Sequence, residues 1–297
     1  MNLSELSGKY STDAKCHELL KKLRWPKGVI CPRCESKKIF RLSAQSKFEC
    51  GKCQYQFTAT VGTVFQDSHI PLEKWFQAVL LLCEARKGFS ANQMKRTLGI
   101  GCYRTAWYLC HRIRAAMIER QKSILGGIVE MDETYFGGKK KGITMADAKA
   151  AKQIVLGIRQ RGGELRFFQA KNVTARTLAE FIKGNVSKDV EMFVTDEFMS
   201  YPYAAQRSGV SRKHKTIKHK ETYVVGNIHT NTIESAFSLF KRGVMGTWHK
   251  LSAKHLPAYL NEMTFRFNRR NDLDLFIDTL RHMITTRTLP YKRLIAA

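Results

Sequence analysis

The sequence predicts a multidomain α+β protein whose helices and strands are concentrated in different parts of the chain. Three observations support this prediction: two Cys-x-x-Cys pairs near the N-terminus, apolar residues at helical spacing after Pro71, and strand-like apolar segments after Gly127. We therefore expect a cysteine-rich domain at residues 1–65, a helical segment at 66–125, and a domain of strands and helices at 126–297.

The composition describes a folded chain with a large positive charge. Of its 297 residues, 43% are hydrophobic, and Lys plus Arg number 51 against 25 acidic residues, a formal net charge of +26. This excess points to a polyanion, most often nucleic acid, with an anionic membrane surface as the rival. The sequence contains no apolar run of about 18 residues and no signal-peptide pattern at its polar start. We expect an intracellular protein without disulfides that binds nucleic acid and no membrane.

The first domain carries a metal-ligand pattern. An amphipathic helix is predicted at residues 11–23, and two Cys-x-x-Cys pairs follow it, separated by 15 residues. The four cysteines are Cys31, Cys34, Cys50 and Cys53. Two such knuckles are typical of a closed tetrahedral zinc site with a structural role, whereas four unrelated buried thiols would not repeat the spacing. We predict a zinc ribbon.

The second domain shows a helical period of 3.6 residues. Its first apolar stripe consists of Leu72, Trp75, Phe76, Val79, Leu80 and Cys83. Ser90 is the expected cap of a shorter helix, the segment 99–101 forms a turn, and a third helix covers about 103–120. This order is typical of a helix-turn-helix, with a plain helical bundle as the alternative. In the first case the third helix faces DNA with its basic residues, namely Arg104, Arg112 and Arg114.

The third domain alternates predicted strands with helices. The expected elements are strands at 128–135, 153–159, 165–170 and 191–195, and a helix at 175–183. A basic run between the first two strands is either a solubilising loop or a DNA contact. It contains Lys139, Lys140 and Lys141. A later run with Lys213 and Lys215 is basic enough to follow phosphates.

Three acidic residues stand where a metal site for phosphate chemistry is built. Asp132 and Asp196 each stand at the end of an apolar run, and Glu234 lies on a predicted helix whose apolar stripe faces a core. On that helix Lys241 follows Glu234 by seven residues and lies about 20° away from it. Such carboxylates hold divalent metal ions. The alternatives are a solvated Glu–Lys pair on the helix, and an acidic cluster that pairs with surplus Lys and Arg.

Other carboxylates compete with Glu234 for the third position. Glu133 and Glu197 directly follow the two aspartates, so on a strand they are expected to point to the opposite face. Glu262 stands four residues before Arg266, a spacing that favours a structural ion pair. We therefore expect Asp132, Asp196 and Glu234 to form the site.

Five phrases of the sequence, taken together, resemble one known family. They are 23–34 (LRWPKGVICPRC), 61–65 (VGTVF), 105–114 (TAWYLCHRIR), 129–138 (VEMDETYFGG) and 231–235 (NTIES). A cysteine pair alone is common, whereas the acidic blocks in this order behind a ribbon are specific. On these phrases, which cover most of residues 15–270, the chain resembles insertion-sequence transposases of the DDE type, in the Merlin-related, ISXO2-like group.

The resemblance implies an RNase H-like catalytic domain, a mixed sheet with helices on both sides that carries Asp132, Asp196 and Glu234. For the two Mg²⁺ or Mn²⁺ ions of such chemistry, we assign Asp132 to bridge both, with Asp196 and Glu234 each holding one. Lys241 matches a position that holds DNA ends in such enzymes, and we expect Arg242 beside it to contact DNA as well.

The expected protein is a transposase that binds the terminal inverted repeats of its element, cuts the ends and joins the 3′ ends to target DNA. Joining needs two ends held together, so we expect a homodimer or higher oligomer on double-stranded DNA, in a bacterial cytoplasm and associated with the nucleoid. One alternative is an RNase H-like nuclease or resolvase that cuts without joining. Another is a DNA-binding regulator with an inert catalytic domain, against which the three carboxylates argue.

Overall fold

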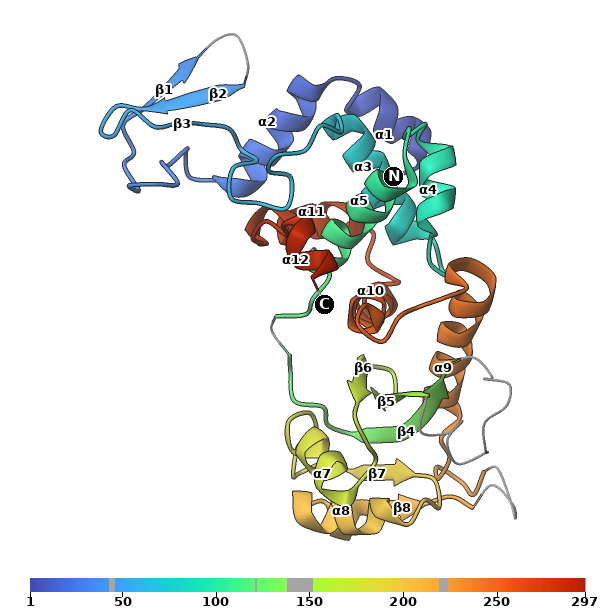
Figure 1. Ribbon diagram of the computed structural model, residues 1–297. Coiled ribbons are helices and arrows are strands. Elements are labelled where there is room, and N and C mark those ends of the chain that lie inside the picture. Colours follow the sequence, from blue (N-terminus) through green and yellow to red (C-terminus); the bar gives the residue numbers. More distant parts are fainter. Residues whose placement is uncertain (43–45, 121, 138–151, 219–223, 297) are drawn as a thin grey trace. The chain divides into compact units, whose positions relative to one another are not determined.

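The computed structural model of the chain describes residues 1–42, 46–120, 122–137, 152–218 and 224–296. The chain folds into two compact units (Figure 1). The first unit consists of Met1–Ile118 together with Arg269–Ala297, and the second consists of Glu119–Asn268. Both ends of the chain therefore belong to the first unit.

The first unit begins with two helices and the cysteine-rich domain. Its elements are α1 (Leu3–Lys9), α2 (Asp13–Arg24), β1 (Ile39–Leu42), β2 (Lys47–Cys50) and β3 (Gln56–Phe57). Asn2 caps α1 and Thr12 caps α2 through side-chain hydrogen bonds to backbone amides. The three strands are antiparallel in the order β1-β2-β3. The rings of Trp25, Phe48 and Phe57 meet in the small core beneath them.

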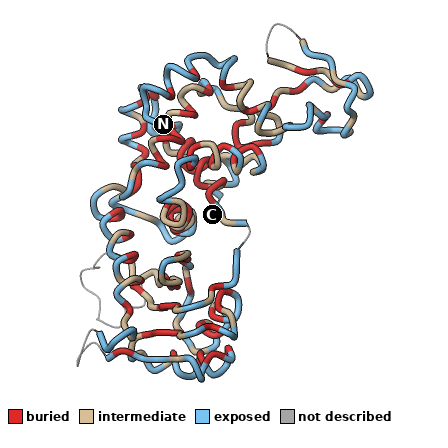
Figure 2. Tube along the Cα trace, turned by 180° about the vertical axis from the view of Figure 1, so that it is seen from behind, coloured by how far each residue is buried: buried red, intermediate tan, exposed pale blue. Residues whose placement is uncertain are grey.

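Three further helices of this unit follow the predicted order. They are α3 (Leu72–Glu84), α4 (Ala91–Thr97) and α5 (Tyr103–Ala116). All six residues of the apolar stripe predicted for α3 are buried. Figure 2 shows buried positions along the helices of this unit. Ser90 caps α4 as expected, because its hydroxyl oxygen accepts a hydrogen bond from the Gln93 amide at 3.1 Å. A turn separates α4 from α5, and the two helices pack against each other.

The C-terminal helices belong to the first unit, whereas the sequence had placed them in the third domain. Helix α11 (Leu275–Thr285) packs against α2, α3 and α5. Its Phe276 ring meets Phe76 edge-on, with centroids 5.7 Å apart. Helix α12 (Tyr291–Ile295) lies beside α5, where the rings of Tyr291 and Tyr108 meet. The periodicity of α11 indicates an apolar face but does not say which core that face will fill.

The second unit contains a five-stranded mixed sheet. Its strands are β4 (Ile128–Phe136), β5 (Gln153–Gln160), β6 (Leu165–Ala170), β7 (Met192–Thr195) and β8 (His214–Thr216). Their order is β6-β5-β4-β7-β8. Neighbours are antiparallel from β6 to β4 and parallel from β4 to β8. The four strands predicted in this part of the chain are therefore confirmed.

Helices cover both faces of this sheet (Figure 1). They are α7 (Ala175–Lys183), α8 (Ser200–Ser208), α9 (Asn231–Gly243) and α10 (Leu256–Asn268). Val129 and Met131 of β4 point into the core shared with α7 and α8. Val155 of β5 points into the core shared with α9 and α10. Because strand residues alternate between faces, Glu130 and Asp132 lie on the α9 side of β4.

The end of α9 departs from regular helix geometry. A π-helical stretch, η2 (Val244–Trp248), continues α9. Elsewhere in this unit, a short 3-10 turn, η1 (Ser211–Lys213), precedes β8. His249, directly after η2, has a positive φ of 58°.

In the described part of the chain, none of the helices combines the length and the apolar character that crossing a membrane requires.

Candidate active site

The four predicted zinc ligands meet in the ribbon. Their sulfur atoms all lie within 4.8 Å of one another. The Sγ atoms of Cys31 and Cys53 are 3.7 Å apart, and those of Cys34 and Cys50 are 3.5 Å apart. Zinc–sulfur bonds of about 2.3 Å in a tetrahedron place sulfurs about 3.8 Å apart, so the set fits a zinc ion. The Arg33 and Lys52 amides also donate to the Cys31 and Cys50 sulfurs, each at 3.4 Å.

The sheet brings the two predicted aspartates together. Asp132 lies on β4, and Asp196 directly follows β7, the parallel neighbour of β4. Oxygen atoms of Asp132, Asp196 and Glu133 all lie within 4.8 Å of one another. Three carboxylates at this distance match the oxygen ligands that Mg²⁺ and Mn²⁺ prefer. We call these three residues the acidic cluster.

Glu133 belongs to the acidic cluster, which corrects the expectation that it points away from Asp132. Strand β7 pairs with β4 only as far as Glu130. Beyond this pair the ladder between the two strands ends, which leaves space next to β4 for side chains from both of its faces. The hydroxyl of Tyr201 on α8 donates to the Glu133 carboxylate from the other face of the sheet.

Burial, together with crowding of like charges, raises the pKa of Asp132. Burial, and then the charges of Asp196 and Glu133, raise its pKa from 3.8 to about 7, and Glu234 adds to the same shift. The hydrogen bond that the Asp132 carboxylate accepts from the Glu133 amide acts in the opposite direction. A bound divalent cation would relieve this repulsion, because it favours the ionised carboxylate.

This shift predicts how the stability of the metal-free protein depends on pH. Between pH 3.8 and about 7 the folded protein keeps a proton on Asp132 that the unfolded chain releases. The free energy of unfolding should therefore fall as pH rises through this window, by about 4 kcal/mol for the full shift. Added Mg²⁺ should stabilise the protein more at about pH 8 than at about pH 5.5, where binding must displace the proton.

Thermal unfolding at both pH values, with and without Mg²⁺, measures this effect. Asp132→Asn is the control, because it removes the titrating group and should flatten both the pH dependence and the Mg²⁺ response. An equal Mg²⁺ effect at the two pH values would contradict the prediction.

Glu234 lies on the helix that borders the acidic cluster. It is half-buried in the first turn of α9 and accepts a hydrogen bond from the Thr230 hydroxyl at 2.6 Å. Its charge contributes to the raised pKa of Asp132. The tight grouping of carboxylate oxygens found among the described residues comprises Asp132, Glu133 and Asp196, with Glu234 outside it. Lys241 and Arg242 are exposed in the last turn of the same helix.

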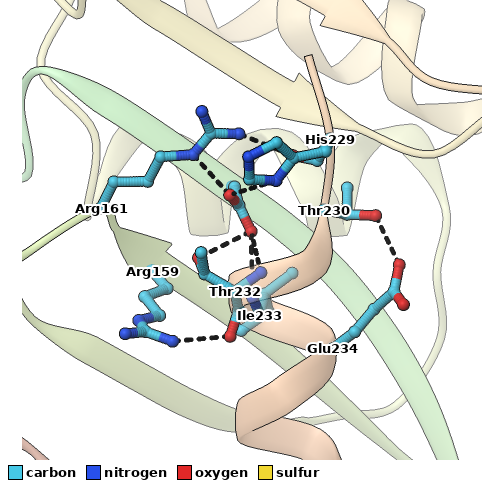
Figure 3. Close-up of polar contacts among 8 residues, drawn as sticks. Arg159, Arg161, His229, Thr230, Thr232, Ile233 and Glu234 are labelled. Carbon is cyan, nitrogen blue, oxygen red and sulfur yellow. Dashed lines mark hydrogen bonds and ion pairs between the residues drawn. The ribbon is translucent and has the colours of Figure 1, made fainter. Parts of the chain in front are cut away.

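A buried carboxylate that the sequence reasoning missed, Glu130, lies at the start of α9. It is fully buried on β4, two residues before Asp132. Its carboxylate accepts hydrogen bonds from Arg161 and from the first turn of α9 (Figure 3). An acidic residue inside an apolar strand, on the same face as Asp132, was the available signal.

The basic residues predicted to contact DNA differ in how far they are exposed to solvent. Those exposed to solvent are Arg104, Lys213, Lys215, Lys241 and Arg242. Lys139, Lys140 and Lys141 lie outside the described residues.

Arg112 and Arg114 are buried, with 3% and 1% exposure, contrary to the expectation that they face DNA. The Arg112 guanidinium lies over the rings of Trp75 and Tyr108, at 5.0 and 5.1 Å from their centroids, and donates to the Gln66 carbonyl. Helices α3 and α11 pack against α5, so residues outside its apolar stripe are also covered. The exposed basic end of α5 is its first turn, with Arg104.

Comparisons with known proteins agree with the division into two units. Residues 124–268 match the family model described as an ISXO2-like transposase domain, and residues 11–56 match a transposase zinc-ribbon domain. The first match includes the acidic cluster and α9, and the second includes the four cysteines predicted to bind zinc. A protein of Halobacterium salinarum, named as an uncharacterized protein in transposable element ISH50, is 26% identical over 275 residues. The alignment covers 86% of this chain and 91% of that protein.

Proposed function

The chain belongs to the ISXO2-like transposases, and from this premise we propose that it cuts the ends of an insertion sequence and joins them to target DNA. The observation that carries the proposal is the meeting of Asp132, Glu133 and Asp196 beside α9, within the segment that matches the transposase domain. A cluster of carboxylates on a protein with a net charge of +26 is suited to metal-dependent chemistry on a polyanion.

We also propose that the second unit has an RNase H-like fold. The sheet order supports this assignment, because three antiparallel strands are followed by two parallel ones with helices on both faces. In this arrangement Asp132 lies on the central strand and Asp196 on the end of its parallel neighbour. Open sheets of this kind commonly bind their ligands at the carboxyl ends of the strands.

Asp132, Asp196 and Glu234 would hold the metal ions, with Glu133 bordering the same space. When bound, Mg²⁺ or Mn²⁺ supplies electrostatic stabilisation of the attacking and leaving oxygens of a phosphodiester. Asp132 would be the central ligand, because the charges of Asp196, Glu133 and Glu234 all act on its carboxylate. Glu234 would complete the site from α9, where its Oε1 accepts a hydrogen bond from the Thr230 hydroxyl.

Positively charged side chains would position the DNA. Lys241 and Arg242 are exposed on the helix that carries Glu234, so they can contact phosphates next to the cut. Arg104, in the exposed first turn of α5, is the candidate contact of a helix-turn-helix formed by α4 and α5. Joining needs two ends in one complex, so the active form is proposed to be a dimer or higher oligomer on DNA.

The test uses the wild-type protein and a labelled duplex that carries the terminal inverted repeats flanking its gene. With Mg²⁺ we expect nicking at the repeat end and then a joined product with a target plasmid. A duplex with a scrambled repeat is the control and should not be cut. Cutting without joining would identify a nuclease or resolvase, and binding without cutting would identify a regulator.

A further inference from the structure

The buried carboxylate of Glu130 makes an unusually complete set of contacts with the start of α9. Its Oε2 accepts hydrogen bonds from the Thr232 amide at 2.9 Å, the Thr232 hydroxyl at 2.8 Å and the Ile233 amide at 3.0 Å. Its Oε1 accepts from Arg161 Nε at 2.6 Å and lies 3.4 Å from His229 Nδ1. Both oxygens are therefore satisfied, as a charge with no solvent exposure requires (Figure 3).

Glu130 acts as the N-terminal cap of α9. The residue at the cap position, Thr230, uses its hydroxyl to hold Glu234 instead of a backbone amide. The free amides of the first turn are taken by a carboxylate from β4, about 100 residues earlier in the chain. Negative charge is stabilising at this end of a helix. A local cap fixes only the helix start, whereas this cap also attaches the helix to a strand.

Two arginines of β5 and its following turn hold the same segment. Arg159 donates to the Thr232 carbonyl at 2.7 Å, and Arg161 donates to the His229 carbonyl at 2.9 Å (Figure 3). Two residues before Arg159, Gly157 lets α9 lie close to the sheet, because an added Cβ would come within 2.6 Å of the Phe237 ring. Gly157 is paired with Asp132 across the two strands. The beginning of α9 is thus attached to β4 and β5 at several points.

Through these contacts Glu130 connects the strand that carries Asp132 with the helix that carries Glu234. Glu130 and Asp132 lie on the same face of β4, about 7 Å apart along the strand. Thr232, which Glu130 binds, precedes Glu234 by two residues in the first turn of α9. We propose that Glu130 is a positioning residue that sets where Glu234 lies relative to Asp132. This inference rests on the proposed function, since it assumes that Glu234 is a metal ligand.

The test measures Mn²⁺ binding by electron paramagnetic resonance in the absence of DNA. Glu130→Gln keeps the side-chain shape and should weaken Mn²⁺ binding by about 10–100-fold, the usual cost of losing a group that orients a ligand. Glu234→Gln should weaken it as well, and the double variant should bind Mn²⁺ no more weakly than Glu234→Gln alone. This non-additivity would not arise from a loss of general stability. Glu130→Asp keeps the charge and should recover part of the affinity.

Hydrogen exchange of the peptide covering 230–240 gives an independent readout. Exchange there should be faster in Glu130→Gln, while a peptide of α10 should remain as in the wild type. The matched control is Glu164→Gln, which removes a carboxylate bonded to an arginine of the same sheet, Arg166, away from α9. It should leave both Mn²⁺ binding and exchange at 230–240 unchanged.

The outcomes separate this inference from the proposed function. Normal Mn²⁺ affinity in Glu130→Gln, or additive losses in the double variant, would overturn the positioning role. Normal Mn²⁺ affinity and normal cutting in Glu234→Gln would instead refute the proposed ligand, while faster exchange in Glu130→Gln would still show the anchoring of α9. If Glu130→Gln does not fold, Thr232→Val carries the same test, because it removes one hydroxyl donor to Glu130. It should lower Mn²⁺ affinity in the same direction by a smaller factor.

Discussion

Asp132→Asn, Asp196→Asn and Glu234→Gln should each reduce cutting and joining by at least about a thousandfold, equivalent to about 4 kcal/mol of transition-state stabilisation. Each change keeps the side-chain shape and removes the charge that holds a metal ion. Binding to end DNA should stay nearly as in the wild type, because the cationic surface is unchanged. Cleavage of a labelled end duplex with Mg²⁺ and a gel-shift assay measure the two activities.

Glu197→Gln is the matched control for these variants. Glu197 directly follows Asp196 but is exposed, so its loss should leave measurable cutting at close to the wild-type rate. The stability of metal-free Asp132→Asn at about pH 8 tests whether its activity is lost through unfolding. This stability should not fall, because the substitution removes a buried charge that the neighbouring carboxylates repel. Robust cutting by Glu234→Gln would mean that the third ligand has to be sought elsewhere.

Glu133→Gln distinguishes between the expectation from sequence and the observed cluster. Strand alternation alone predicts that this variant keeps measurable cutting, because Glu133 would point to the opposite face of the strand from Asp132. The structure places its carboxylate within 4.8 Å of those of Asp132 and Asp196. We therefore expect a measurable loss of Mn²⁺ affinity, smaller than that of Asp132→Asn. An unchanged affinity would show that Glu133 only borders the site.

Cys34→Ser should unfold the ribbon and remove its zinc. Structural zinc contributes about 10–16 kcal/mol of apparent binding free energy in small domains, more than a three-stranded sheet with a few apolar side chains can replace. Besides the cysteines, the buried residues of the ribbon core are Phe48 and Phe57, with only partly buried apolar side chains packed against them, namely Trp25, Val29, Ile39, Tyr55 and Val61. Zinc content by mass spectrometry should fall from one ion per chain to a small fraction, and limited proteolysis should cut within residues 27–57.

Cys102→Ser is the control for the zinc prediction. Cys102 is exposed and lies outside the ligand set, so this variant should keep one zinc ion and resist proteolysis like the wild type. Full zinc occupancy in Cys34→Ser would refute the assignment of Cys34 as a ligand. Hydrogen exchange in the second unit should be unaffected by either variant, because its core is built from other residues.

Elements with one buried face were predictable from the sequence. Strands β4, β5, β6 and β7 and helix α7 lie where apolar periodicity predicted them, because half-buried elements repeat their apolar residues at the period of the structure. The ion pair between Glu262 and Arg266, 3.1 Å apart and buried, also follows from local spacing on one helix. Both kinds of prediction depend on residues that are neighbours in the chain.

Polar residues inside the cores were not predictable in this way. Arg112 was expected on a DNA-facing surface, but its partner Gln66 and the ring of Trp75 come from other segments. The sequence indicates no role for Glu130, because its partners on α9 follow it by about 100 residues in the chain. A buried charge is stable only with a complete set of partners, and sequence periodicity does not reveal partners from distant segments.

The sequence by itself identified the four cysteines and the two aspartates that the structure brings together, because the spacing of a knuckle and an acidic residue after an apolar run are local features. Only the tertiary structure decided which other carboxylates join the site. Strand β7 ends beside β4 before reaching Asp132, which opens the same space to Glu133 from the opposite face. Glu130 meanwhile attaches α9, and with it Glu234, to the strand that carries Asp132. Strand lengths and long-range contacts of this kind arise only when segments far apart in the chain pack together.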